Sequence, residues 1–150
     1  MAARFLLAAL VFSTLTGCAH YRKELDDRPP FSEHSFRYFD LEVHWRSRDL
    51  GETLRISGTI RNLRSFFLEN LEVTARLVDS QGKVFARGTA SDFPTDVSPG
   101  ATEPFELVIP TRGKKTERIR FSYLYWLAEA VPLPRGDEDV PHFGSFASPP

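Results

Sequence analysis

From residue 36 onward, apolar and polar residues alternate along much of the chain with a period of two. The alternation is clearest in residues 54–61, 71–77, 105–109 and 119–125. Successive side chains of a β-strand point to opposite faces, so this period predicts strands with one buried and one solvated face. The pattern therefore predicts an all-β protein.

Turn signals separate these strands at short intervals. Asp79-Ser80-Gln81-Gly82 predicts a four-residue turn, and residues 84–89 return as its hairpin partner. Ser98-Pro99-Gly100 predicts a second turn, Pro110 ends the strand that follows it, and residues 112–115 predict a basic hairpin tip. About seven short strands at this spacing predict an immunoglobulin-like antiparallel β-sandwich.

The two ends of this pattern are less regular. Phe36 and Tyr38 alternate in one register and Val43 and Trp45 in the other, which predicts a first strand with a register shift near Asp40. In the last strand, alternation divides the aromatic residues within 123–126 between the core face and the opposite face of the sheet. The core-facing residues are Tyr123 and Tyr125, and the opposite one is Trp126.

The first 18 residues follow a different pattern. Arg4 precedes an apolar run over residues 5–15, and Leu15-Thr16-Gly17-Cys18 follows. The run is shorter than the roughly 17 residues that span a bilayer. This segment resembles a bacterial lipoprotein signal peptide that ends in a lipobox. The alternative is an ordinary secretory signal with a chance cysteine.

The lipoprotein resemblance implies a site of attachment and a compartment. Cleavage would fall between Gly17 and Cys18, and the Cys18 thiol would carry diacylglycerol, with palmitate or another acyl chain on its amine. Ala19, where Asp would favour inner-membrane retention, implies the outer membrane. We therefore expect a periplasm-facing protein that is held to the membrane by its N-terminal lipid.

The chain then divides into four parts. We expect a signal peptide at 1–17, a lipidated tether at 18–35, the sandwich at 36–131, and a Pro-rich tail at 132–150. The tail contains the acidic run Asp137-Glu138-Asp139, and its composition predicts disorder. The alternative, which we favour less, is that Phe143 and Phe146 pack back on the domain.

Charge and cysteine content argue against a nucleic-acid partner and against disulfide bonds within the chain. The chain has 19 Lys and Arg residues against 20 Asp and Glu residues, a formal net charge of −1 at pH 7. This balance predicts no large basic patch and no nucleic-acid partner. Cys18 is the only cysteine, so no disulfide can form within the chain. We expect no cofactor other than the covalent lipid.

The middle of the chain resembles a family. Its pattern comprises Ile56–Asn62, Leu71–Asp79, Gly82, Pro99-Gly100 and Pro104-Phe105. This series resembles the FxLYD and related immunoglobulin-like domains of bacterial envelope proteins, although Leu-Val-Asp stands here where those domains have Leu-Tyr-Asp. Late-embryogenesis-abundant domains share a similar strand pattern, and both assignments stay open. The resemblance implies a sandwich without known catalytic residues.

No catalytic or metal-binding motif is present in the sequence. It has no nucleophile-elbow motif, no Gly-rich phosphate loop and no histidine pair at helical spacing. Asn62 and Gly58 are better explained by the backbone, Asn62 as a left-handed residue at a strand end and Gly58 as a bulge or close approach. The four histidines, for which we predict no metal role, are His20, His34, His44 and His142.

One segment is a candidate partner-binding loop. Arg64, Phe66, Phe67 and Leu68 lie between two predicted strands, and loops at the end of a sandwich commonly bind partners. The alternative, which we favour, is that Phe66 or Leu68 folds over the open end of the core.

These observations predict a non-enzymatic lipoprotein that acts as an interaction or assembly module on another envelope protein. Confinement to the membrane would raise the effective concentration of a weak contact. A carrier of a small ligand or lipid between the sheets is the first alternative. An enzyme whose residues meet only in the fold is the second.

Overall fold

The computed structural model describes residues 34–128 and 141–150, and these residues form strands without a helix. The strands are β1 (His34–Arg37), β2 (Leu41–Asp49), β3 (Thr53–Asn62), β4 (Phe67–Val78), β5 (Val84–Ala90), β6 (Asp96–Val97), β7 (Thr102–Pro110), β8 (Arg118–Ala128) and β9 (His142–Ser148). One sheet has the order β1-β2-β3-β7, and the other has the order β5-β4-β8-β9 with β6 paired to β4. All pairings are antiparallel.

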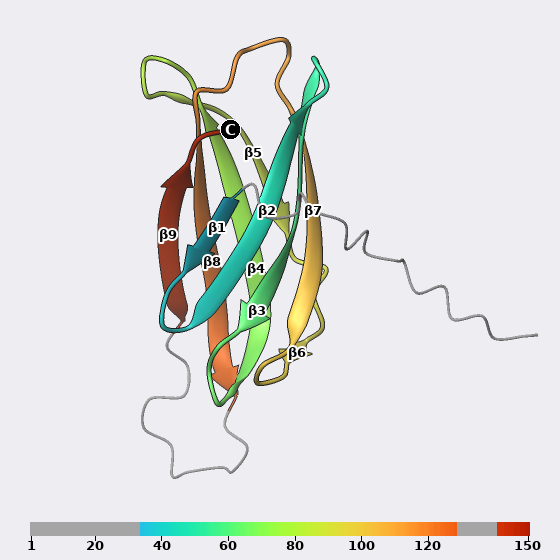
Figure 1. The fold of residues 1–150 in the computed structure, drawn as a ribbon, viewed down its shortest axis with the longest axis vertical. Coiled ribbons are helices and arrows are strands. Elements are labelled where there is room, and N and C mark those ends of the chain that lie inside the picture. Colours follow the sequence, from blue (N-terminus) through green and yellow to red (C-terminus); the bar gives the residue numbers. More distant parts are fainter. Residues whose placement is uncertain (1–33, 129–140) are drawn as a thin grey trace, which may run out of the picture.

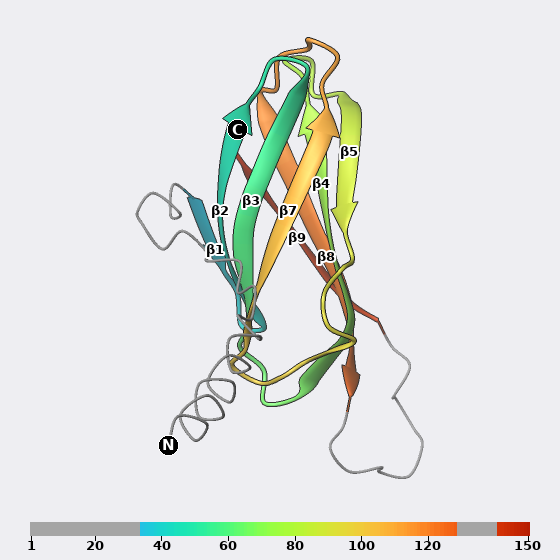
Figure 2. The same ribbon diagram turned by 90° about the vertical axis from the view of Figure 1, so that its right-hand side faces the viewer.

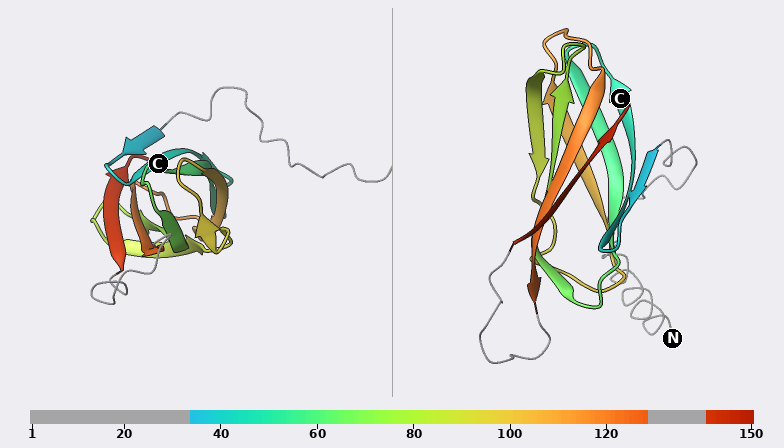
Figure 3. Two further views of the ribbon diagram at one scale, coloured as in Figure 1. Left: turned by 90° about the horizontal axis from the view of Figure 1, so that it is seen from below. Right: turned by 90° about the vertical axis from the view of Figure 1, so that its left-hand side faces the viewer.

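The two sheets pack face to face along the long axis of the molecule (Figures 1 and 2). Viewed along that axis, their strands enclose the core (Figure 3). The order β2-β3-β7 corresponds to strands A, B and E of the immunoglobulin fold, and β4-β8-β9 corresponds to C, F and G. The protein is therefore an immunoglobulin-like antiparallel β-sandwich, as the alternation predicts.

The alternating positions form the core. In β3 and β8 the predicted inward residues Ile56, Ile60, Phe121 and Tyr125 are all 1% exposed or less. Gly58 pairs with Trp45 on one side and Phe105 on the other, and a Cβ atom there would collide with both neighbours and with the His44 carbonyl. The predicted close approach at Gly58 is confirmed.

The segment before Trp45 forms two strands instead of one. The chain reverses over residues 38–40, where the amide of Tyr38 donates to the carbonyl of Leu41 at 2.9 Å. β1 then pairs with β2, with Phe36 opposite Val43. The change of phase near Asp40 therefore marks a turn, and the prediction of a single shifted strand is wrong.

The sandwich extends beyond the predicted boundaries at both ends. β1 begins at His34, inside the predicted tether, and β9 lies inside the tail for which composition predicts disorder. β9 pairs with β8, and Phe146 stacks on Phe36 at 4.0 Å and on Phe121 at 4.9 Å between ring centroids. Disorder is therefore the wrong expectation for β9, because Phe146 packs against the core, whereas Phe143 on the same strand is 81% exposed.

One of the turns predicted from the sequence is present in the structure, and another is not. The predicted turn at residues 79–82 joins β4 to β5, and the Asp79 carboxylate accepts from the amides of Gln81 and Lys83. Residues 112–115 are not a hairpin tip, because β7 pairs with β3 and β8 pairs with β4. That segment crosses from one sheet to the other at the upper end of the molecule in Figure 1.

Candidate functional site

Asp40 ties together the end of the sandwich where β1 turns into β2. Its side chain is 3% exposed, and its two carboxylate oxygens accept from the hydroxyls of Tyr123 at 3.1 Å and Tyr125 at 2.8 Å. Its backbone carbonyl accepts from the amide of Leu63 at 2.9 Å. The β1–β2 and β3–β4 connections are thus held to each other and to β8.

Burial and Asp40 both act on the two tyrosines. Burial is the largest cause that raises the pKa of Tyr123 and of Tyr125 well above the usual value. The Asp40 carboxylate adds to the increase in both pKa values, since it would repel a phenolate and accepts hydrogen bonds only from the neutral hydroxyls. Both tyrosines therefore stay protonated.

The buried side chain of Asn62 holds the β3–β4 connection in place through hydrogen bonds. Its buried amide nitrogen donates to the carbonyls of Phe66 at 2.8 Å and Val97 at 3.0 Å, and its amide oxygen accepts from the backbone of Arg64 at 2.8 Å. Asn62 has a structural role, as the sequence predicts, but it acts through the hydrogen bonds of its side chain and not through a left-handed backbone. The left-handed backbone lies at Asn70, where β4 bulges opposite β8.

Above this framework lies an exposed cluster that we call the Arg64 patch, formed by Tyr38, Phe39, Arg64 and Phe66. Phe39 is 60% exposed, Tyr38 57% and Phe66 38%. The Arg64 guanidinium lies 5.3 Å from the centre of the Phe39 ring and 6.0 Å from that of Phe66. Both distances are within cation–π range, so the Arg64 side chain joins the β1–β2 and β3–β4 connections in one surface.

The predicted binding loop is thus divided between surface and core. Arg64 and Phe66 belong to the Arg64 patch, whereas Phe67 and Leu68 are the first residues of β4. Leu68 is fully buried and covers the end of the core, so the favoured alternative holds for Leu68 but not for Phe66.

The sequence patterns do not predict Tyr38 and Phe39 as patch residues. The alternation assigns Tyr38 to a strand, although two adjacent aromatic residues before Asp40 break the period of two. That break is the signal in the sequence that points to a turn. Aromatic residues in a turn cannot both face the core, and here both are exposed.

The histidines pack on neighbouring side chains. His34 stacks on Trp45, His142 stacks on Tyr125, and His44 lies 3.6 Å from the Glu42 carboxylate. No group of three potential metal ligands occurs within residues 34–128 and 141–150. The same residues contain no helix able to span a membrane. His20, Gly17 and Cys18 lie outside the described residues.

Comparisons with known proteins give distant structural similarity alone. No family model and no curated protein matches the chain. The GAE domain of GGA2p from Saccharomyces cerevisiae is 12% identical at a TM-score of 0.42, over 77% of this chain and 96% of that domain. A β-glucuronidase from glycoside hydrolase family 2 is 13% identical at a TM-score of 0.39, over 59% of this chain. This chain covers 10% of that enzyme's length.

Proposed function

We propose that this protein is a membrane-anchored envelope lipoprotein that acts as a non-catalytic interaction or assembly module, and that the Arg64 patch contacts its protein partner. The observation that carries the proposal is the exposure of three aromatic rings, two of them beside Arg64 and the third, Tyr38, against Phe39. Tyr and Arg are enriched in the residues that dominate binding energy at protein interfaces. A rigid set of such side chains loses little conformational entropy when it binds.

The support beneath the patch favours binding over simple coverage of the core. Asn62 and Asp40 already hold both connections, and Leu68 already closes the end of the core. The rings of Phe39 and Tyr38 lie at 4.7 Å from each other and remain largely exposed. Exposed apolar side chains that are gathered in this way are typical of an interaction surface.

One atom within the patch also lacks a hydrogen-bond acceptor. Arg64 is half-buried, and its Nε has no hydrogen-bond partner among the described residues. A buried donor without a partner costs about 1–3 kcal/mol. Because this atom is inaccessible to solvent, an acceptor on a bound protein would reach it only after the Arg64 side chain moves.

The anchor belongs to the same proposal. The lipobox at residues 15–18 would place the lipid at Cys18, and 15 residues separate Cys18 from β1. Such a length spans at most about 54 Å when extended. The patch would then meet partners within a thin layer at the outer membrane, facing the periplasm.

The carrier alternative has less support from the interior. The space between the sheets is occupied by side chains such as Tyr125, Phe121 and Ile109, each 1% exposed or less. A ligand between the sheets would have to displace them.

Site-specific photocrosslinking in intact cells tests the proposal. A photoreactive phenylalanine replaces Phe66 in one variant, Phe39 in a second, and Val108 in a third. Val108 is 52% exposed on β7 and serves as the matched control. We expect one discrete adduct from positions 66 and 39 and none from position 108. Equal labelling at all three positions, or none at the patch in folded protein, would contradict the proposal.

A further inference from the structure

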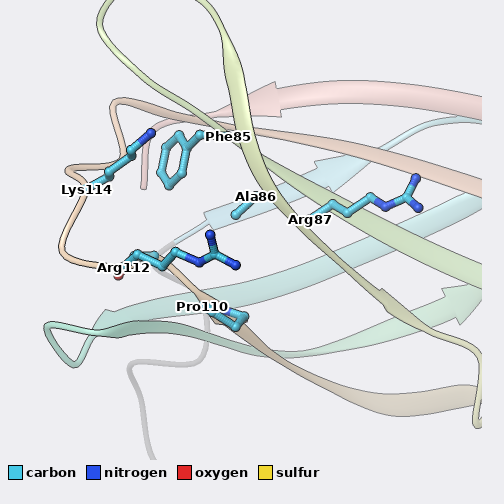
Figure 4. A pocket seen from close by; sticks show the side chains of 7 residues that line it. Phe85, Ala86, Arg87, Pro110, Arg112 and Lys114 are labelled. Carbon is cyan, nitrogen blue, oxygen red and sulfur yellow. The ribbon is translucent and has the colours of Figure 1, made fainter.

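A second surface feature lies at the opposite end of the sandwich from the Arg64 patch. The β7–β8 connection and β5 border a pocket of about 330 Å³. Its lining is Phe85, Ala86, Arg87, Pro110, Thr111, Arg112 and Lys114. Three of these seven residues are cationic and none is acidic. Figure 4 shows Arg112 and Lys114 extending from the connection toward β5, with Lys114 beside Phe85.

Arg112 occupies an unfavourable backbone conformation at this pocket. Its φ angle is 54°, that of Gly113 is 71°, and the amide of Lys114 donates to the carbonyl of Thr111 at 3.1 Å. Two positive φ angles in a hydrogen-bonded turn define type I′, whose first central position usually holds Asn, Asp or Gly. An arginine held in this region is an outlier of the kind found at ligand sites.

The turn is fixed to the body of the protein. Thr111 is 2% exposed, its hydroxyl donates to the carbonyl of Gly51 at 2.8 Å, and its amide donates to the carbonyl of Glu52 at 2.9 Å. On the other wall, the Lys114 ammonium lies 5.8 Å from the centre of the Phe85 ring. Arg112 and Lys114 are therefore held beside the pocket before any ligand binds.

More positive charge continues from the pocket across the outer face of the sheet. Arg87 pairs directly with Arg76 on β4, and Arg76 pairs with Arg120 on β8. Neighbouring strands are about 4.8 Å apart, and like charges placed directly opposite each other destabilise a sheet. Arg76 also donates to the Ser122 hydroxyl at 2.8 Å, which is a neutral partner.

In the described part of the chain, the carboxylates near the pocket do not form ion pairs with its cations. Glu117 pairs with Lys115 at 2.8 Å, outside the pocket lining, and Glu52 lies on the side of the turn that faces Gly113. Within the described residues, no carboxylate lies within 4.0 Å of the charged nitrogens of Arg87, Arg112 or Lys114. An anion that entered the pocket would meet Arg112 and Lys114, whereas the Arg87 side chain extends away from them on the other side of β5 (Figure 4).

From these observations we infer that this pocket binds a phosphate monoester carried on a sugar-sized molecule. Guanidinium groups match the geometry of phosphate oxygens and form charge-assisted hydrogen bonds with them. The volume is at the lower end of the range for small-molecule sites, and the Phe85 ring offers an apolar face to the body of the ligand. The site is separate from the Arg64 patch and does not depend on the function proposed for it.

The test is a titration of the full chain, labelled with ¹⁵N and held in neutral detergent, in a phosphate-free buffer of low ionic strength. The probes are glucose 1-phosphate, inorganic phosphate and glucose. We expect glucose 1-phosphate to cause saturable shifts of the amide signals of residues 85–87 and 111–114. Glucose should cause none, and inorganic phosphate should bind at least tenfold more weakly because it leaves Phe85 without a contact.

Three variants complete the experiment. Arg112→Gln and Lys114→Gln should each weaken glucose 1-phosphate binding at least tenfold. Arg61→Gln, on the exposed face of β3, removes one cation from the other sheet and should leave the affinity unchanged. The inference is overturned if glucose binds equally well, if no saturable shifts occur, or if both pocket variants bind like the parent. Inorganic phosphate binding as tightly as glucose 1-phosphate would overturn the assignment of a sugar-sized ligand.

Discussion

At the scale of single residues, Asp40 connects the core to the surface where we place the partner contact. Replacing Asp40 with Ala leaves the buried hydroxyls of Tyr123 and Tyr125 without their acceptor. Each unsatisfied buried group costs about 1–3 kcal/mol, so we expect a loss of about 2–5 kcal/mol in the free energy of unfolding. Urea denaturation measures this loss. Asp92→Ala, at an exposed position, should change stability by less than about 0.5 kcal/mol, and an equal effect of both substitutions would contradict the role of Asp40.

The same two tyrosines predict how stability depends on pH. Their pKa values are raised in the folded protein, so their contribution is complete below the unfolded-state pKa of about 10. Above that pH the unfolded chain binds fewer protons than the folded one, and stability falls as pH rises. The slope should reach about 1.4 kcal/mol per pH unit for each tyrosine.

Denaturation between pH 9 and 11 measures that slope. Tyr123→Phe removes one of the two groups and leaves Tyr125 bound to Asp40, so the variant should lose about 1.4 kcal/mol less stability than the parent across this interval. Identical slopes for the parent and the variant would show that Tyr123 is not the group that titrates.

A substitution at Arg112 should stabilise the protein, in contrast to the substitution at Asp40. A left-handed conformation costs a residue other than glycine about 1–2 kcal/mol, whereas glycine adopts it freely but loses more entropy on folding. We therefore expect Arg112→Gly to raise the free energy of unfolding by about 0.5–1 kcal/mol while it weakens glucose 1-phosphate binding. Chemical denaturation and the titration above measure the two effects, with Lys114→Gln as the control that changes binding alone. A less stable Arg112→Gly variant would show that the conformation is not strained.

At the scale of elements, β9 shows where periodicity is a poor guide. The strand has seven residues, follows a Pro-rich stretch and includes Gly144, so neither composition nor propensity predicts it. Its stability comes from distant partners, since Phe146 stacks on Phe36 and Phe121. β3 and β7, by contrast, alternate over nearly their whole length, and the pattern predicts their ends to within about three residues.

Gly144 allows β9 to pair with β8. It lies opposite Tyr123, and a Cβ atom at this position would lie inside van der Waals contact with the Tyr123 ring. Gly144→Ala must therefore displace either the ring or the strand, and we expect a destabilisation of about 1–3 kcal/mol. Thermal unfolding measures it against Ser145→Ala, which alters an exposed position of the same strand. Equal stability of the two variants would mean that β9 contributes little to the fold.

At the scale of the whole molecule, charge and aromatic residues are distributed between the two ends in a way that composition cannot reveal. The net charge of −1 predicts no large basic patch, yet strand register places Arg76, Arg87 and Arg120 in one row. The Arg64 patch likewise combines residues from two connections that lie more than 20 positions apart in sequence. Both surfaces depend on contacts between distant segments, which a single sequence does not specify, so the sequence predicts Arg64, Phe66 and a basic segment at residues 112–115 but not Phe39 or the pocket.

The proposed anchor and the patch act together only at this largest scale, which yields the last prediction. A lipid at Cys18 would confine the domain to a layer near the membrane, where the effective concentration of a partner in the same layer is far higher than in free solution. Cys18→Ser removes the lipid acceptor and leaves the sandwich unchanged. We expect it to release the protein from the membrane and to lower the yield of the adduct formed through position 66 at least tenfold. Membrane fractionation and the crosslinking assay measure these two effects at matched expression. The released protein should keep the parent's urea midpoint, which separates loss of the anchor from loss of the fold. An undiminished adduct in released protein would mean that the patch alone supplies the affinity, and a variant that stays on the membrane would refute the lipid anchor.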